Sequence, residues 1–351
     1  MKRILKWIGI LLIIVIAVAL GYVGYVFASY SRISDDLPLE TNGVAGDMLN
    51  TGEQYKIATY NIGFGAYDAE FSFFMDGGER ARAVSQDAVL NNTKGAASVL
   101  LDQGVDIALL QEVDIDSDRS HHVDQLGMLK ADFADHQLVS AINYDSAYLP
   151  YPFHEPIGKS KSSIAVLSRF PMENARRYSL PIMQDVSKIV DLDRCFIRTE
   201  LPTQDGKMLC LYNVHMSAYL SDQQVHQAQI ETLMSKMQQD YEAGHYVICG
   251  GDFNHDMTGD SATKFGFETG SQSWAMPFPT EYLPAGFHIE ADDSIPSCRN
   301  ADEPYQPGHT FVITVDGFIV SDNVQVDQVM NIDTAFAYSD HTPVVMSFTL
   351  Q

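Results

Sequence analysis

Cysteine is scarce in this sequence of 351 residues. It has four cysteines, and none of them belongs to a CxxC motif or stands with histidines at zinc-finger spacing. This pattern argues against a structural zinc site. Cys195, Cys210 and Cys249 lie in apolar, strand-like runs, where a buried free thiol is the ordinary interpretation. An exported protein could pair two of the four cysteines, and their spacing leaves that pairing open.

Basic residues are also few: the chain has 22 Lys and Arg against 46 Asp and Glu, which gives a net charge of -24. Proteins that bind nucleic acid neutralise phosphates with Lys and Arg, so this balance argues against an intracellular nucleic-acid partner. It does not exclude a nuclease, because a bound divalent cation can offset local carboxylates. The sequence has neither an internal repeat nor a low-complexity tract, and its length suits one large domain or two small ones.

The longest apolar run lies at the N-terminus. The twenty residues Ile8–Phe27 carry no charge, and about 20 apolar residues are what a helix needs to cross a bilayer. Three basic residues precede the run, so the positive-inside rule places the N-terminus in the cytoplasm and everything after Tyr30 outside. The alternative is a cleaved signal peptide with its site at Val26–Ala28. We expect a single-pass protein of the cell membrane with an extracellular domain.

The remaining chain divides into a linker and one domain. Residues 31–54 contain Pro, Gly, Asn and Asp without a sustained period, which predicts a linker. A strand-like run at 55–60, a helical pattern at 79–103 with Val84 facing inward, and a buried apolar run at 105–110 follow. This β-α-β order gathers polar side chains at one rim of a sheet. We therefore expect an anchor at residues 1–30, a linker at 31–54 and a single α/β domain at 55–351.

A further apolar run, Val247–Cys249, ends in two glycines and then presents Asp252 and Asn254. Glycines let the backbone leave a buried strand sharply, so the next side chains project at the rim of the sheet. A carboxylate and an amide two residues apart suit a reaction in which one group activates water and the other holds an oxyanion or a metal. A turn in which an Asx side chain caps its own backbone explains the same residues equally well.

Polar residues also follow other predicted strands. Considered singly, Asn61 could cap a turn, His215 could be a satisfied core histidine and Asp316 could pair with an arginine. Together they suggest one site, because random placement would not put so many polar residues at strand ends. The residues are Asn61, Glu112, His215, Asp252, Asn254, Asp316, Asp340 and His341.

Residues 114–118 look like the start of a calcium-binding loop, but the pattern then fails. Arg119 stands where the loop needs glycine, and Gln125 stands where it needs glutamate. We interpret the acidic residues as the N-terminal end of a helix over 119–131, headed by His121 and His122.

Seven short motifs, taken in order, resemble those of the endonuclease/exonuclease/phosphatase superfamily, which includes DNase I-like nucleases, neutral sphingomyelinases and inositol-polyphosphate phosphatases. The resemblance extends over Tyr55–Gln351. The motifs are Tyr60–Ile62, Leu110–Glu112, Leu167–Pro171, Asn213–His215, Gly251–Asn254, Asp316–Ile319 and Ser339–Pro343.

The resemblance implies a four-layered α/β sandwich, in which two mixed sheets pack face to face with helices outside. It also implies a hydrolase that cleaves phosphoester bonds with a divalent metal, by direct attack of water. Mg²⁺ is the expected metal, with Mn²⁺ or Ca²⁺ as alternatives. Residues 55–351 would then form the catalytic domain.

Three residues are assigned to the metal by this resemblance. Glu112 is the main metal carboxylate with Asn61 beside it, and Asp340 serves the metal or the water. His215 matches a histidine of DNase I-like and sphingomyelinase-like members. Arg194 is a candidate phosphate clamp.

The remaining assignments concern water and phosphate. Asp252 would orient or deprotonate the attacking water, and Asn254 would hold a phosphate oxygen. His341 would contact the phosphate, with its charge and tautomer fixed by a hydrogen bond to Asp316.

Two departures from the superfamily bear on the substrate. Many abasic-site endonucleases have Asp two residues after the first Asn, where this chain has Gly63. They also tend to have basic surfaces, whereas this chain has a net charge of -24. DNA repair inside the cell is therefore not expected.

The stretches 144–153 and 274–278 are rich in aromatic residues. They could lie against lipid, and ordinary loop packing is the alternative.

The sequence thus favours an exported, membrane-anchored, monomeric phosphoesterase that acts on a phosphodiester or phosphomonoester. A phospholipid head group, an inositol phosphate and an extracellular nucleotide are candidate substrates. An extracellular DNase I-like nuclease is the alternative enzyme. A catalytically silent binding module on the same fold is the alternative of another class.

Overall fold

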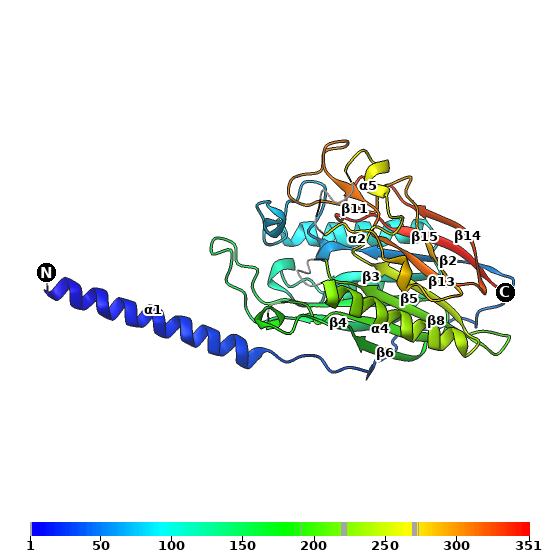
Figure 1. Ribbon diagram of the computed structural model, residues 1–351, viewed down its shortest axis with the longest axis horizontal. Helices are drawn as coiled ribbons and strands as arrows, with labels where there is room; N and C mark the ends of the chain where they lie inside the picture. Colours follow the sequence, from blue (N-terminus) through cyan, green and yellow to red (C-terminus); the bar gives the residue numbers. More distant parts are fainter. Residues whose placement is uncertain (1, 190, 219–222, 269–271, 273) are drawn as a thin grey trace.

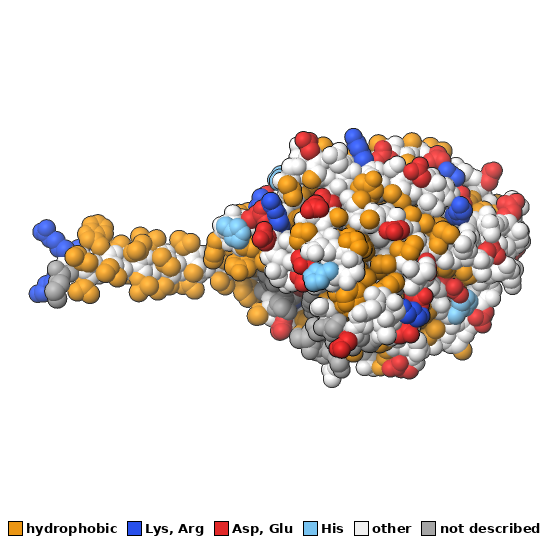
Figure 2. Space-filling view, turned by 90° about the horizontal axis from the view of Figure 1, so that it is seen from above, with side chains coloured by type: hydrophobic (Ala, Val, Ile, Leu, Met, Phe, Trp, Pro, Cys, Tyr) orange, Lys and Arg blue, Asp and Glu red, His pale blue; other side chains and the backbone are white. Residues whose placement is uncertain are grey.

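The computed structural model describes residues 2–189, 191–218, 223–268, 272 and 274–351. Its N-terminal helix α1 (Lys2–Ser29) extends away from a single rounded domain (Figure 1). Figure 2 shows that its surface is apolar on the visible side and that its basic residues gather at the far end. The helix is long and apolar enough to cross a membrane. A signal sequence near the N-terminus would have the same length and composition.

The domain contains two mixed sheets. In each of them, the described residues form one parallel pair, β8 with β9 and β2 with β3, and the other neighbours are antiparallel. The seven-stranded sheet has the order β1 (Leu37–Pro38), β6 (Glu173–Ser179), β7 (Cys195–Pro202), β8 (Met208–His215), β9 (Tyr246–Asp252), β13 (Asp316–Ser321), β10 (Phe287–Glu290). The six-stranded sheet has the order β14 (Val324–Asn331), β15 (Val344–Leu350), β2 (Gln54–Asn61), β3 (Ile107–Asp114), β5 (Lys161–Ser168), β4 (Gln137–Asp145).

The two sheets pack face to face around one apolar core. Leu109 and Ile164 of the six-stranded sheet meet Ile197 and Ile248 of the other sheet in this core, and all four are fully buried. Burial of each such side chain stabilises the fold by about 2 kcal/mol. The core therefore accounts for the pairing of the sheets.

Helices cover the outer faces of both sheets. Leu233 of α4 (Gln223–Glu242) packs with Val247 of the seven-stranded sheet. Leu100 of α2 (Gln86–Asp102) packs with Leu110 of the other sheet, beside α3 (Gln125–Asp132). Helix, sheet, sheet and helix form four layers, which confirms the predicted sandwich.

The shorter elements lie in the connections. The structure adds a two-stranded ribbon, one short helix and five 3-10 turns within the residues it describes. They are β11 (Cys298–Arg299), β12 (Val312–Ile313), α5 (Ser261–Lys264), η1 (Gly63–Gly65), η2 (Phe74–Asp76), η3 (Asp118–Ser120), η4 (Val186–Ile189) and η5 (Thr280–Tyr282).

Helix α2 begins later than the sequence pattern suggests. Its N-cap is Ser85, whose hydroxyl accepts a hydrogen bond from the backbone N–H of Ala88 at 3.1 Å. A capped start satisfies a donor that the first helical turn leaves free. Val84, which we expected to face inward, precedes the cap and is 55% exposed.

The predicted helix over 119–131 is wrong in its first half. His121 and His122 have φ angles of 53° and 58°, in the left-handed region that a helix excludes. Helix α3 starts only after Asp124, whose side chain accepts from the N–H of Gly127 at 2.9 Å. Asp114 is the last residue of β3 and therefore does not lie at a helix terminus. It is buried and paired with Arg119 at 2.8 Å.

The segment 31–54 connects α1 with the first central strand and also packs on the domain. Its strand β1 pairs with β6, and Asn42 forms a bridge with Leu138. Leu49 is fully buried in the core between the sheets. The segment therefore holds the end of α1 near the domain.

All four cysteines are free and buried, which confirms the prediction for Cys195, Cys210 and Cys249. The sequence also predicts that Ser221 caps the helix that became α4. That residue lies outside the described residues.

Candidate active site

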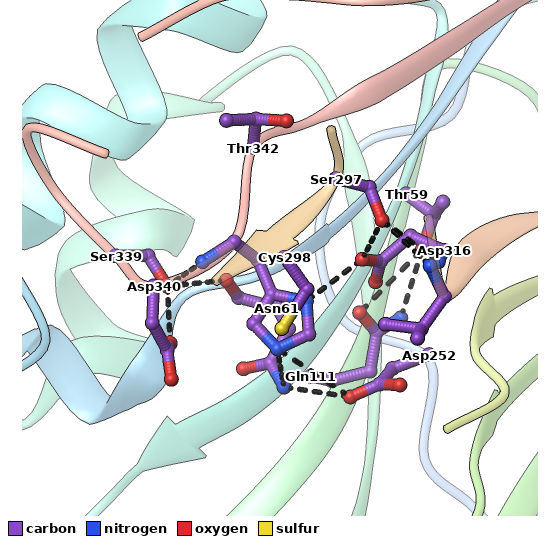
Figure 3. A network of polar contacts seen from close by, with 12 residues as sticks. Thr59, Asn61, Gln111, Asp252, Ser297, Cys298, Asp316, Ser339, Asp340 and Thr342 are labelled. Atoms are coloured by element: carbon purple, nitrogen blue, oxygen red, sulfur yellow. Dashed lines mark hydrogen bonds and ion pairs between the residues drawn. The ribbon is translucent and has the colours of Figure 1, made fainter. Parts of the chain in front are cut away.

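The topology brings the predicted site residues to one edge of the two sheets. Asn61 is the last residue of β2, and His215 and Asp252 are the last residues of the parallel strands β8 and β9. The antiparallel strand β13 starts at the same edge, because its first residue Asp316 lies opposite Asp252. Figure 3 shows Asn61, Asp252 and Asp316 converging from these strands.

A pocket of about 320 Å³ opens at this edge. Eight of the nine predicted site residues line it. The ninth, Asp316, contacts Nδ1 of His341 and does not line the pocket itself. The eight are Asn61, Glu112, Arg194, His215, Asp252, Asn254, Asp340 and His341.

Asp316 and His341 form the shortest contact among the predicted residues. The Nδ1 atom of His341 lies 2.7 Å from Oδ2 of Asp316, and the hydroxyl of Ser297 donates to the same oxygen at 2.7 Å. Burial disfavours a charged imidazole, but the nearby carboxylates of Asp316 and Asp252 together raise the pKa of His341 well above its ordinary value. His341 is therefore a cation at neutral pH, with Nε2 directed towards the pocket.

Asp252 lies at the centre of the polar groups. Its Oδ2 accepts a hydrogen bond from Nδ2 of Asn61 at 3.0 Å and lies 3.8 Å from Nε2 of His341. Its Oδ1 accepts from the N–H of Asn254 at 2.9 Å. Burial raises the pKa of Asp252 to about 6. An ionised carboxylate that regains its proton near pH 6 is suited to act as a general base near neutral pH.

His215 differs from His341 in charge. Its Nε2 lies 3.4 Å from Oδ2 of Asp252, a distance at which a charged histidine would form an ion pair. Burial, and then the nearby Arg194, lower the pKa of His215 well below its ordinary value. We therefore interpret the contact as one between a neutral imidazole and a carboxylate.

Glu112 is held in an unusual backbone conformation. It lies at a bulge of β3, between Leu110 and Val113, with a φ of 54°. Bulges redirect a side chain, and strained residues cluster at functional sites. Its Oε1 lies 3.4 Å from Nδ2 of Asn61.

The acidic residues of the pocket suit a hard cation. Burial raises the pKa of Asp340 to about 7, and the Glu112 carboxylate adds to the increase. In the part of the chain that the structure describes, neither residue forms an ion pair with Lys or Arg. A divalent cation held by these residues would offset the repulsion between their negative charges.

A second group could also hold a cation. Ligand atoms of Asp252, Asp316 and His341 all lie within 4.8 Å of one another. We favour the pair of Glu112 and Asp340, because Oδ2 of Asp316 and Nδ1 of His341 already contact each other at 2.7 Å.

Asn254 and Arg194 contact the same backbone carbonyl. The amide of Asn254 donates to the oxygen of Met216 at 2.8 Å, and Nη1 of Arg194 donates to it at 3.0 Å. Nε of Arg194 is buried and has no hydrogen-bond partner among the residues that the structure describes. An anionic oxygen in the pocket would satisfy this donor.

Several residues of the site carry no recognisable sequence signal. Ser297, which positions Asp316, and Cys298, which lines the pocket, belong to a stretch of the chain without periodicity. A polar link between Gln111 and Asn213, at 2.8 Å, joins the two sheets beneath the site. Its two residues fall within the recognised motifs, but only the fold reveals that they meet.

The chain matches one protein family over most of its length. The family model described as "Endonuclease/Exonuclease/phosphatase family" matches residues 58–341, a range that includes all nine predicted site residues. This chain belongs to the endonuclease/exonuclease/phosphatase family. Its members hydrolyse phosphoester bonds. No curated protein matches the chain significantly.

Solved structures show the same fold at low sequence identity. An endonuclease/exonuclease/phosphatase from Beutenbergia cavernae has a TM-score of 0.58 and 15% identity, over 85% of this chain and 72% of that one. A humanized TDP2 of D. rerio has a TM-score of 0.53 and 14% identity, over 84% and 99%. The human Nocturnin catalytic domain has a TM-score of 0.52 and 16% identity, over 89% and 98%.

Proposed function

We propose that this chain is an exported, membrane-anchored hydrolase that depends on a divalent metal and cleaves a phosphodiester or a phosphomonoester. The observation that carries this proposal is the buried pair of Asp316 and His341 next to Asp252, in a pocket lined with acidic and amide groups. A cation, a base and oxygen ligands are the groups that attack of water on a phosphate ester requires.

The residues divide this work between them. Asp252 takes a proton from the attacking water, and the hydrogen bond from Asn61 fixes the orientation of its carboxylate. His341 stabilises the negative charge that develops on the phosphate oxygens, and Asp316 keeps it protonated. Asn254 and Arg194, which also line the pocket, hold further phosphate oxygens.

The metal would be held by Glu112 and Asp340, with Asn61 beside them. A bound Mg²⁺ or a similar ion supplies a Lewis acid for the phosphate oxygens. The side-chain oxygen of Asn61 accepts from the N–H of Gly63 at 3.0 Å, so its amide nitrogen faces Glu112. The two carboxylates are therefore the stronger ligands.

The substrate class follows from charge and location. A net charge of -24 disfavours a polyanion such as DNA. A membrane anchor with an exported domain favours a phospholipid head group, an inositol phosphate or a similar small phosphoester. An extracellular nuclease is the competing enzyme, and the assay below includes its substrate.

The test is turnover by the purified full chain with Mg²⁺, measured on a chromogenic diester, a chromogenic monoester, sphingomyelin vesicles and DNA. We expect hydrolysis of at least one ester other than DNA, and a loss of about a hundredfold or more in His341→Ala. Preferential cleavage of DNA would establish the nuclease instead. A chain that binds phosphate esters but hydrolyses none of them would be a binding module.

A further inference from the structure

The end of α1 touches a loop that is rich in aromatic residues, which we call the aromatic loop (residues 147–153). The hydroxyl of Tyr22 donates to the carbonyl of Tyr148 at 3.0 Å, and the N–H of Tyr148 donates to the hydroxyl of Tyr25 at 3.2 Å. Val26, the one buried residue of α1, packs against Ala147. The loop therefore lies beside the last turns of α1, at the same height along the helix axis.

The contacts between α1 and the aromatic loop lie near the end of the apolar run. Tyr22 and Val26 lie one to five residues before Phe27, where the uncharged run ends. At a rise of about 1.5 Å per residue, the contacts lie within about 8 Å of the end of that run. Tyrosines are typical of the interface between lipid and water. If α1 spans the bilayer, the loop that touches it must lie at that interface.

The tip of the aromatic loop is exposed and apolar. Phe153 is 83% exposed, the highest value for a large apolar side chain in the described part of the protein, and Tyr151 is 60% exposed. Met75, on a neighbouring turn, is also 60% exposed. Contiguous exposed apolar groups mark a surface that binds another apolar body. Figure 2 shows the apolar surface of α1 continuing onto the part of the domain that it meets.

A row of aromatic rings connects this tip to the pocket. Phe153 packs on Tyr151 with ring centroids 5.8 Å apart, and Tyr151 packs on Phe74 at 5.8 Å. Phe74 contacts Phe73 at 5.1 Å, and Phe73 contacts Tyr67 at 5.5 Å. Phe73 and Tyr67 line the pocket. The apolar surface is therefore continuous from the loop tip to the pocket wall.

The base of the loop belongs to the pocket itself. Leu149 and Gly158 form a backbone bridge at the base, and Leu149 and Ile157 line the pocket. Leu149 directly follows Tyr148, the residue that α1 contacts. A residue that lines the pocket is thus the direct neighbour in sequence of a residue that contacts the end of α1.

We propose that the aromatic loop enters the interface of the membrane that α1 spans, and that the pocket faces the phosphoester head groups of lipids in that same membrane. The second part rests on the proposed function, whereas the first depends only on α1 as a membrane span. Docking is driven by apolar groups, because a chain with a net charge of -24 gains nothing from anionic lipid. Neutral phosphatidylcholine is therefore a sufficient membrane.

The first experiment measures contact with lipid directly. The full chain is reconstituted in phosphatidylcholine vesicles with an environment-sensitive fluorophore at Phe153→Cys or, as the matched control, at Leu101→Cys. Leu101 is 41% exposed and lies at the end of α2 that leads into the start of β3, away from the pocket. The four native cysteines are buried, so labelling favours the introduced one.

Lipids that carry a nitroxide should quench the label at position 153 and leave the label at position 101 unchanged. Equal quenching at the two positions, or none at 153, would overturn the docking. This readout needs no enzymatic activity, so it decides the first part of the proposal even if the proposed function fails.

The second experiment measures where the substrate comes from. Phe153→Asp should lower hydrolysis of sphingomyelin and of a phosphatidylinositol phosphate in the same vesicles by about tenfold, because an apolar side chain gains a factor of that order on burial. It should leave hydrolysis of a soluble chromogenic phosphoester unchanged. Phe153→Leu, which keeps the apolar group, and Leu101→Asp should change neither rate.

The outcomes separate the two proposals. A wild-type chain that cleaves the soluble ester but neither lipid would overturn the access to lipid and leave the proposed function intact. Unchanged hydrolysis of lipid in Phe153→Asp would overturn the role of the loop. A wild-type chain that cleaves no ester would end the proposed function, and with it the lipid substrate.

Discussion

His341 depends on Asp316 for its positive charge. The carboxylate lies 2.7 Å from Nδ1 and raises the pKa of the imidazole against the effect of burial. Asp316→Asn keeps the shape but removes the charge, so the pKa of His341 should fall. We expect kcat on the basic side of the pH profile to start falling at a lower pH than in the wild type. We also expect the rate to fall by about a hundredfold or more. The measurement is kcat against pH.

The two residues should also behave as one unit. His341→Ala should lower the rate by a factor similar to that of Asp316→Asn, and the double mutant should lose little more. Strictly multiplicative losses would contradict the pairing. The double-mutant cycle needs only turnover at one pH at which all four proteins are folded.

Asp340 should be a source of instability in the absence of metal. Burial raises the pKa of Asp340 to about 7, so the folded chain holds this proton more tightly than the unfolded chain does. Stability should therefore fall as pH rises from about 4 to 7. With a chelator present, Asp340→Asn should raise the unfolding free energy at pH 8 by on the order of 1–3 kcal/mol and change little at pH 4.

Thermal unfolding with and without Mg²⁺ provides the control for Asp340. Mg²⁺ should raise the melting temperature of the wild-type chain more than that of Asp340→Asn, because a ligand of the folded state stabilises it. Equal increases in the two proteins would show that Asp340 does not hold the metal.

At the scale of the element, Gly251 allows β9 to approach β8. A Cβ atom at this position would lie 2.0 Å from the carbonyl oxygen of Val214, which the backbone cannot accommodate. We expect Gly251→Ala to lower the unfolding free energy by about 3 kcal/mol and to displace Asp252. Gly206→Ala is the control, since its Cβ meets no atom within 4 Å and only its φ of 84° is unfavourable.

The control should cost only about 1 kcal/mol. Chemical denaturation of both variants, followed by circular dichroism, measures the difference. A Gly251→Ala chain as stable as Gly206→Ala would contradict the close approach of the two strands.

Elements were predictable where periodicity and glycine mark them. The strands that end at Asn61 and Asp252 were both expected, because apolar runs precede polar residues there. The start of α2 was misplaced because a serine cap, and not the apolar pattern, sets it. The apolar run 311–320 has the pattern of one strand, but the structure divides it into β12 and β13, which belong to different sheets.

The position of the candidate site was partly predictable, because Asn61, His215, Asp252 and Asp316 lie at strand ends, where sequence order fixes position. Eight predicted residues do line one pocket. Ser297 and the aromatic row from Tyr67 to Phe153 were not predictable as parts of the site, because they come from irregular segments that meet only in three dimensions. The orientation of Asn61, with its nitrogen towards Glu112, is likewise a property of the fold alone.

The whole molecule should consist of a membrane anchor and an exported domain. The uncharged run follows three basic residues, so everything after Tyr30 should lie outside the cell. Protease added to intact cells should remove the domain and leave the anchor in the membrane. A domain that becomes sensitive only after lysis would contradict this topology.

We propose that the acidic pocket hydrolyses a phosphate ester with the help of a divalent metal. Glu112 holds a left-handed conformation at the edge of that pocket, and its replacement by glutamine preserves size while removing charge. The most direct measurement is hydrolysis of a chromogenic phosphodiester and monoester by the full chain, for the wild type and Glu112→Gln, before and after chelation. We predict that chelation abolishes turnover, that Mg²⁺ or Mn²⁺ restores it, and that Glu112→Gln loses about a hundredfold or more in rate. Full activity in excess chelator, or an unchanged rate in Glu112→Gln, would contradict the account.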